Sequence, residues 1–179
     1  MTERDYPQDD KMTKFMQKGF TLIEIMTAIT VFSVGILGVF SLVPLAISIS
    51  QTNSDHLIAG HLALEGMEIL RNIRDSNWLE QAQEPLTVWN EGLAVCENGC
   101  EADYTALSNQ DPLLVVYGSG RYLKLDSDGF YNYASGTVTK FKREITVNSL
   151  GSVLEAAVSV QWSPSSAPVV LKEKFYDWR

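Results

Sequence analysis

The hydrophobic pattern of the chain begins with one long apolar run. Between Glu24 and Asp55, 30 consecutive residues carry no charge. A membrane-spanning helix needs about 20 apolar residues, so we expect the segment 20–50 to cross a membrane. Beyond it, apolar residues recur at helical spacing with polar residues between them, which predicts an amphipathic continuation of the helix over 51–76.

The second half of the chain alternates between apolar and polar positions, as strands with one buried face do. Short turns between consecutive strands favour an antiparallel sheet. The sequence therefore predicts an α+β fold in which the sheet packs on the outer half of the helix. Strands are expected at 113–117 and 121–125, joined as a hairpin through Gly-Ser-Gly, and at 139–147, 153–162 and 168–176.

The 179 residues suffice for one ordinary domain and an anchor. We predict a polar, basic leader at 1–19, the helix at 20–76 and a globular head at 77–179. Within the head, 77–112 is expected to be a loop region with short strands around 86–89 and around the cysteines.

The charge distribution argues against a nucleic-acid surface. The formal net charge is −8, and the densest basic cluster, Lys-Phe-Lys-Arg at 140–143, lies in a strand-like segment. Lysines and arginines precede the apolar run, and the next cation after it is Arg71. Because cationic residues near a span stay on the cytoplasmic side, the head is expected to be extracytoplasmic.

The two cysteines, Cys96 and Cys100, stand in Cys-Glu-Asn-Gly-Cys. In an extracytoplasmic domain this spacing is typical of a small disulfide loop closed across an Asn-Gly turn. Free thiols and half of a zinc site are the alternatives, although zinc needs two further ligands and no histidine lies nearby in sequence.

Candidate chemistry is sparse. His56 and His61 point about 140° apart on a helix and cannot share a metal. The segment 125–133 contains Asp126 and Asp128 before a glycine, like the start of a calcium loop, but position twelve is Thr137 instead of an acid. A simple Asp-Gly turn is the alternative. No nucleophile constellation is present, so we expect neither an enzyme nor a cofactor.

The most informative stretch is Lys-Gly-Phe-Thr-Leu-Ile-Glu-Ile-Met at 18–26, where Glu24 stands at the front of the apolar run. An unpaired carboxylate in a membrane is costly and marks a candidate functional site, although a residue at the membrane edge can also snorkel. The stretch resembles the prepilin signature of type IV pilins and of the pseudopilins of type II secretion. Gly19, Phe20 and Glu24 match that signature position by position.

The resemblance implies cleavage between Gly19 and Phe20 by a prepilin peptidase, and N-methylation of the new Phe20. It also implies a partner for Glu24, namely the amine of Phe20 in the same or a neighbouring subunit, since pairing offsets the desolvation of both charges.

Further segments, at 62–78, 141–147 and 158–162, are similar to pilus-modification (PilV-like) minor pilins. The resemblance implies a minor subunit of a type IV pilus or pseudopilus, with other pilins, the peptidase and an inner-membrane assembly platform as partners in a homo- or heteropolymer. The expected location is the inner membrane and then the filament. A major pilin and a non-polymerising membrane-anchored binding domain remain alternatives.

Overall fold

The computed structural model describes residues 19–84, 86–106, 114–118 and 120–177. The chain divides into two compact units, Met1–Ser48 and Ile49–Arg179. The described residues contain one α-helix, α1 (Leu22–Gln81), whose first part belongs to the first unit and whose remainder belongs to the second.

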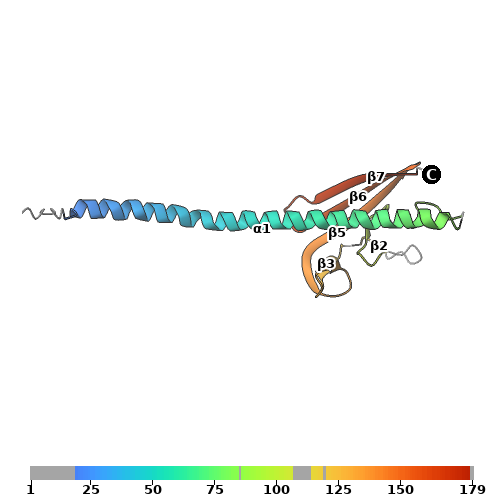
Figure 1. Cartoon of the computed structure of the whole chain (residues 1–179), viewed down its shortest axis with the longest axis horizontal. Helices are drawn as coiled ribbons and strands as arrows, with labels where there is room; N and C mark the ends of the chain where they lie inside the picture. Colours follow the sequence, from blue (N-terminus) through green and yellow to red (C-terminus); the bar gives the residue numbers. More distant parts are fainter. Residues whose placement is uncertain (1–18, 85, 107–113, 119, 178–179) are drawn as a thin grey trace, which may run out of the picture. The chain divides into compact units, whose positions relative to one another are not determined.

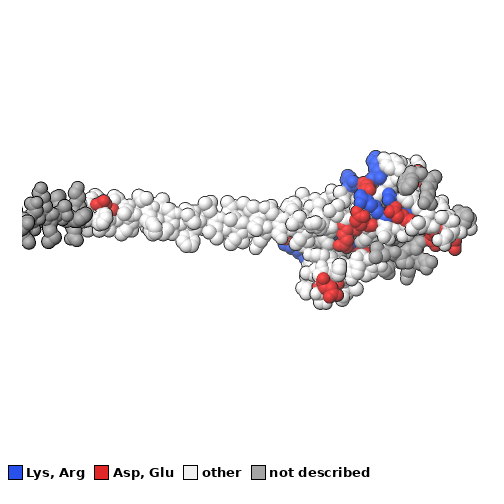
Figure 2. Space-filling model, in the orientation of Figure 1, with Lys and Arg blue, Asp and Glu red and all other residues white. Residues whose placement is uncertain are grey.

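In the first unit, every described residue of α1 is exposed, and most of them are apolar. Figure 2 shows a surface without charged atoms along this segment, apart from one acidic patch at its beginning. By length and composition the helix is able to cross a membrane. Such an exposed apolar surface is stable in lipid, where the backbone polar groups are satisfied within the helix.

In the second unit, α1 buries one face against the sheet. The helix ends at Gln81 instead of the predicted residue 76. The reason is that Asn77 and Trp78 still belong to the buried face, where Asn77 Nδ2 donates to the carbonyl oxygens of Trp89 (3.2 Å) and Glu91 (2.9 Å). These bonds tie the last turns of α1 to the segment that follows it.

Seven strands in the described residues form one antiparallel sheet (Figure 1). The central strand is β5 (Thr137–Leu150). One of its edges pairs with β6, which pairs in turn with β7; the other edge pairs with β3 near its start and with β1 at Ile145. The remaining elements are a 3₁₀ helix and six strands: η1 (Leu93–Cys96), β1 (Cys100–Glu101), β2 (Val115–Val116), β3 (Tyr122–Leu125), β4 (Tyr131–Asn132), β6 (Val153–Gln161) and β7 (Val169–Tyr176).

The α+β prediction is confirmed, and the three long strands lie close to their predicted bounds. The predicted hairpin between 113–117 and 121–125 is wrong. Instead, β2 pairs with β1, and β3 pairs with β4 and β5. The long β5 offers β3 more ladder partners than the short β2 does. No strand forms at 86–89 among its described residues; β1 begins at the second cysteine.

The core lies between the buried face of α1 and the inner face of the sheet. At Gly66 the helix lies close to the sheet. A Cβ atom added there would lie 2.9 Å from Val158 Cγ1 and 3.1 Å from Arg143 Cδ. The absence of a side chain at Gly66 therefore lets the helix lie directly on β6.

Candidate processing and assembly site

The first turn of α1 has a defined N-cap. Gly19, Phe20 and Thr21 precede the helix, and the backbone N–H of Glu24 donates to Thr21 Oγ1 (3.3 Å) and to the Thr21 carbonyl (3.1 Å). Ser or Thr followed three residues later by Glu is the sequence pattern of a capping box. Sequence reasoning missed the role of Thr21, although this pattern stands in the sequence.

Glu24 occupies the first turn, where the helix dipole favours a negative charge. It is the only charged residue from Gly19 to Ser54. Among the residues that the structure describes, no donor reaches its carboxylate. The site therefore presents one negative charge at the start of an apolar helix.

The hydroxyl groups in the same segment are satisfied within the helix. The side chains of Thr27, Thr30, Ser33 and Ser41 donate to carbonyl oxygens three or four residues earlier, at 2.7–2.9 Å. Such bonds let hydroxyl groups enter lipid without water. A carboxylate only accepts hydrogen bonds, so Glu24 differs from these residues in needing a donor from elsewhere.

Phe20 is 78% exposed, and both Gly19 and Phe20 lie outside the helix. The peptide bond between them is therefore in an accessible segment outside the helix. The structure thus places the three predicted residues of the signature within the first turn of α1 and the short segment before it.

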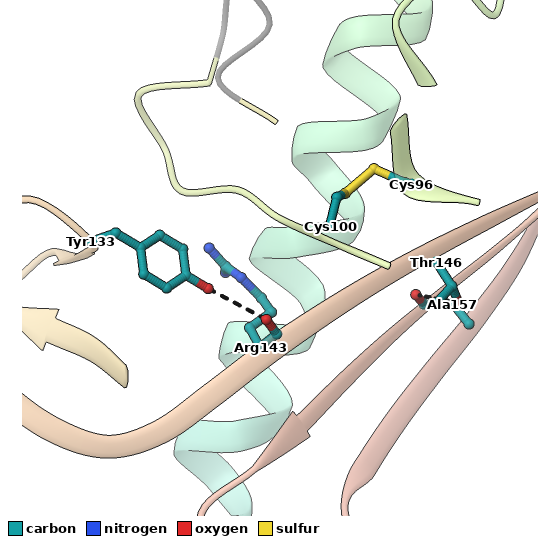
Figure 3. Close-up of a disulfide and its surroundings, with 6 residues drawn as sticks. All are labelled: Cys96, Cys100, Tyr133, Arg143, Thr146 and Ala157. Atoms are coloured by element: carbon teal, nitrogen blue, oxygen red, sulfur yellow. Dashed lines mark hydrogen bonds between the residues drawn. A yellow bond between two sulfur atoms is a disulfide. The ribbon is translucent and has the colours of Figure 1, made fainter. Parts of the chain in front are cut away.

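The head is held to α1 by a buried arginine (Figure 3). Arg143 extends from the inner face of β5 and has no exposed surface. Its Nη1 donates to the Leu62 carbonyl (3.0 Å) and to Glu65 Oε1 (3.2 Å), and its Nη2 donates to the Ala102 carbonyl. One side chain therefore joins the helix, the sheet and the segment after β1. Its inward position follows from the alternation of β5, a signal the sequence analysis left unused.

A second set of polar groups surrounds this arginine. Glu101 is 2% exposed and accepts from the backbone N–H (2.6 Å) and Nε (2.5 Å) of Arg121. Burial raises the pKa of Asp103, but hydrogen bonds from Thr105 and from the Tyr133 N–H, together with the charge of Arg143, outweigh it, so that its pKa lies below the ordinary value. Burial, aided by the charge of Glu101, raises the pKa of Tyr133 to about 12.

Cys96 and Cys100 are joined by a disulfide with Cα atoms 4.7 Å apart. The bond links the end of η1 to the first residue of β1 and lies beside α1 in Figure 3. Gly99, between them in the Asn-Gly turn, has a φ of 89°, which a side chain would strain. The cysteine pair thus fixes the start of a strand only two residues long.

The aspartates of 125–133 form a turn. Asp126 Oδ1 accepts from the N–H groups of Asp128 (3.0 Å) and Phe130 (2.9 Å), and Asp126 Oδ2 accepts from Asn132 Nδ2 (3.3 Å). Its carboxylate thus caps the turn between β3 and β4, as the Asp-Gly alternative predicts. No cluster of three or more metal-ligating side chains occurs among the described residues.

The two histidines do not meet in a common site. The ring of His56 makes an edge contact with Trp162, at 4.6 Å between centroids. His61 is exposed and lies beside an apolar groove between α1 and the start of β7.

Fold and site together define a class of protein: an α+β chain with one long apolar N-terminal helix, as in the pilin fold, and with the features of a single-pass membrane-anchored protein. The prokaryotic N-terminal methylation motif matches residues 14–40, which include Gly19, Phe20 and Glu24. The chain therefore carries a type IV pilin-like signature; the family that this motif marks is structural, not catalytic. No curated protein and no solved structure shows significant similarity to the chain.

The residues of the motif before Gly19 lie outside the described part of the chain. The segments that resemble PilV-like proteins, 62–78, 141–147 and 158–162, lie outside the matched range. The minor-pilin assignment therefore stays a prediction.

Proposed function

We propose that the chain is the precursor of a minor pilin-like subunit. A prepilin peptidase cuts it between Gly19 and Phe20, the new amine of Phe20 is methylated, and the subunit joins a type IV pilus or a type II-like pseudopilus through its helix. The observation that carries the proposal is the methylation motif, with its lone Glu24 at the start of an uncharged helix.

The local structure supports cleavage at this bond. Gly19 and Phe20 precede the helix and are exposed, and the cap at Thr21 fixes where the helix begins. A peptidase needs an extended backbone at the bond it hydrolyses, and the cap keeps the helix from extending over that bond.

Cleavage also supplies the donor that Glu24 lacks. The amine released at Phe20 is cationic and would lie near the same end of α1. A charged group at the centre of a membrane costs about 2.5–3.5 kcal/mol on insertion scales, and pairing with an opposite charge offsets such a cost. An amine on a neighbouring subunit would make the pair a determinant of helix register in the filament.

The proposed location follows from the helix and the flanking charges. The chain is anchored by a single pass in the inner membrane, with the leader cytoplasmic and the head outside. Its partners are other pilins or pseudopilins, the peptidase and the assembly platform, in a homo- or heteropolymer.

The intact mass of the membrane-extracted chain, with and without a prepilin peptidase, tests the proposal. We expect loss of residues 1–19 and gain of one methyl group only when the peptidase is present. A bulky substitution, Gly19→Leu, should block the cut. Gly35→Ala, at a helix position whose added Cβ meets no atom within 4 Å, is the matched control and should be cut normally. An uncut wild-type chain, or a cut after the apolar segment, would contradict the proposal.

Quantifying this subunit in sheared filaments separates the minor role from that of a major pilin. A minor subunit is expected at a small fraction of the filament protein. A subunit that forms most of the filament would be the major pilin, and one absent from filaments would be an anchored domain that does not polymerise.

A further inference from the structure

The negative charge of the chain is concentrated in one part of the sequence. Residues 75–120 contain eight acids and no lysine, arginine or histidine, so they account for the whole net charge of −8. Three of these acids, Glu84, Glu91 and Glu97, lie in the acidic segment 84–97, which follows the end of α1. All three are exposed, and none forms an ion pair with a residue that the structure describes. The segment therefore offers uncompensated negative charge to a partner.

The acidic segment also carries apolar side chains that the head leaves uncovered. Leu86 is 96% exposed and Val88 is 52% exposed. Both stand between Glu84 and Glu91 in the sequence. Protein–protein interfaces are commonly built in this way, with an apolar anchor at the centre and polar groups around it.

An open pocket of about 400 Å³ lies on the outer face of the sheet, across β5, β6 and β7. Its lining includes Ala157, which stands opposite Lys172 of β7, and Glu155, which stands opposite Lys174. The short side chain of Ala157 leaves room between its longer neighbours. The pocket therefore has space for an apolar side chain beside the ammonium group of a lysine.

The charges that line the pocket are only partly paired. Lys174 forms an ion pair with Glu155 at 2.7 Å, and Glu173 is paired with Arg71. Lys172 is exposed and belongs to no ion pair in the described part of the chain. Its charge also acts on Glu155, but that residue supplies a single negative charge for two lysines. One positive charge therefore remains uncompensated at the pocket.

The pocket and the acidic segment lie on opposite faces of the sheet. Asn148 and Glu155 pair across β5 and β6 and line the pocket. The next pair, Ser149 and Leu154, lies beside Glu97 of the acidic segment, and Leu154 belongs to the core between the sheet and α1. Successive residues of a strand point to opposite faces. A single head therefore keeps the two surfaces apart, whereas two copies can bring them together.

We propose that the pocket lined by Ala157 and Lys172 receives the acidic segment of a second copy of this chain, with Leu86 in the hollow and Glu84 at Lys172. The contact joins different surfaces of the two copies, so it can continue from copy to copy. Its place in a filament rests on the proposed function. Where this subunit is a minor component, the contact would keep its copies adjacent in the filament.

The contact is expected to be weak between free molecules. An exposed ion pair contributes little on its own and is screened by salt. Helices that share one membrane or one polymer raise the effective concentration of the heads, and a weak contact then becomes populated. The test therefore uses the full-length chain in a membrane at low salt.

Photo-cross-linking of the chain reconstituted into vesicles tests the contact. The probe is p-benzoylphenylalanine in place of Val88, which is exposed and close in sequence to Leu86. A mixture of unlabelled and isotope-labelled copies lets mass spectrometry distinguish cross-links between copies from those within one copy. We expect cross-links between copies that map to the strands β6 and β7.

A charge exchange in the same probe background sharpens the test. Glu84→Lys alone, or Lys172→Glu alone, puts like charges at the contact, so the yield of cross-linked dimer should fall by about fivefold or more. Mixing the two variants restores opposite charges between copies, and the yield should recover toward that of wild type. The matched control is Asp128→Lys, which makes the same charge change at an exposed turn outside both surfaces and should cross-link like wild type.

Three results would overturn the proposal. They are cross-links confined to single copies or to other faces of the head, a mixture of the two variants that does not recover, and an equal loss of yield in the control.

Cleavage by a prepilin peptidase in the same vesicles separates this proposal from the proposed function. A chain that is cut after Gly19, but whose heads do not cross-link, overturns the contact between heads alone. A chain that is not cut, but whose cross-links follow the charge exchange, contradicts the proposed function and leaves the contact between copies standing.

Discussion

Arg143, on the central strand, donates from Nη1 to the main-chain carbonyl of Leu62, on the helix, at 3.0 Å and with no exposed surface of its own. The same nitrogen contacts Glu65 at 3.2 Å. A buried guanidinium needs such acceptors, because an uncompensated buried charge is strongly destabilising. The attachment of the head to α1 therefore depends on a polar contact as well as on apolar packing.

Replacing this arginine should be among the most damaging single changes in the head. Arg143→Ala removes all three contacts, leaves a cavity and strands two carbonyl groups, so we expect a loss of about 3–5 kcal/mol in the free energy of unfolding. Lys174→Ala, on an exposed side chain whose partner Glu155 is also exposed, is the control and should cost less. Urea unfolding of the full chain in detergent measures both, and similar losses would contradict this account.

Two glycines of α1 should respond in opposite directions to alanine. At Gly66 the new Cβ meets Val158 at 2.9 Å, so Gly66→Ala should destabilise the head by about 1–3 kcal/mol through overpacking. At Gly60 no atom lies within 4 Å, so Gly60→Ala should stabilise it by up to about 1 kcal/mol through helix propensity. Thermal unfolding of the pair tests the close approach of helix and sheet. A stabilising Gly66→Ala would show that the contact relaxes easily.

Tyr133 should make the fold sensitive to alkali. Its pKa rises from 10.0 to about 12 in the fold, so the folded state holds the phenolic proton more tightly than the unfolded chain. Its contribution, about 2–3 kcal/mol, is fully present below pH 10 and is lost as the pH rises toward 12. Tyr133→Phe should remove this part of the pH dependence of unfolding. If the free energy of unfolding of the variant depends on pH as in wild type, other groups cause the loss of stability in alkali.

Asp103 should affect the stability of the fold at acid pH. Its pKa is lowered in the fold, so its contribution is present above its ordinary value near 3.8 and is lost as the pH falls below it. Asp103→Asn should reduce the stability at pH 7 and flatten the acid limb of the profile. The measurement is the urea midpoint between pH 2 and pH 7. An unchanged acid limb would argue against the role of this carboxylate.

The disulfide should stabilise the head only modestly. In the chain-entropy treatment, closing so short a loop contributes about 2 kcal/mol. Cys96→Ser/Cys100→Ser should therefore fold and lose about that amount. We expect faster amide exchange in β1 and β2, with β6 and β7 unchanged. Exchange that rises across the whole sheet would mean that the bond supports more than the local turn.

Glu24 should matter for assembly and not for insertion. Glu24→Val makes the apolar run more hydrophobic, so the chain should still insert, while its incorporation into filaments should fall at least about tenfold, the equivalent of 1.4 kcal/mol. Thr30→Val is the control, because its hydroxyl bonds only to its own helix. Counting each variant subunit in sheared filaments measures its incorporation. Normal incorporation of the Glu24 variant would favour an anchored domain without a polymer.

The sequence predicted the elements with regular periodicity and missed those that depend on contacts between distant segments. The alternation over 153–162 was enough to place β6 almost to the residue. In contrast, Val115–Val116 pair with Cys100–Glu101 and not with the strand that follows them. A two-residue strand has no periodicity of its own, so its partner cannot be inferred from local pattern.

The functional and buried polar residues also differ in whether the sequence alone reveals them. Gly19, Phe20 and Glu24 are found by a local signature, whose spacing is contained within six residues. Arg143 is different, because its acceptors lie on Leu62 and Ala102, far away in the sequence. Alternation alone shows that the side chain turns inward, but not that a charge is tolerated there.

Among the described strands, β7 pairs with β6 alone, so one edge of the sheet has unpaired backbone groups. Such an edge readily templates cross-β association between molecules. Here the strand carries Lys172, Glu173 and Lys174 in succession, and charges on an edge oppose pairing with another strand. This charged edge would thus oppose association of the head with a second copy through strand pairing.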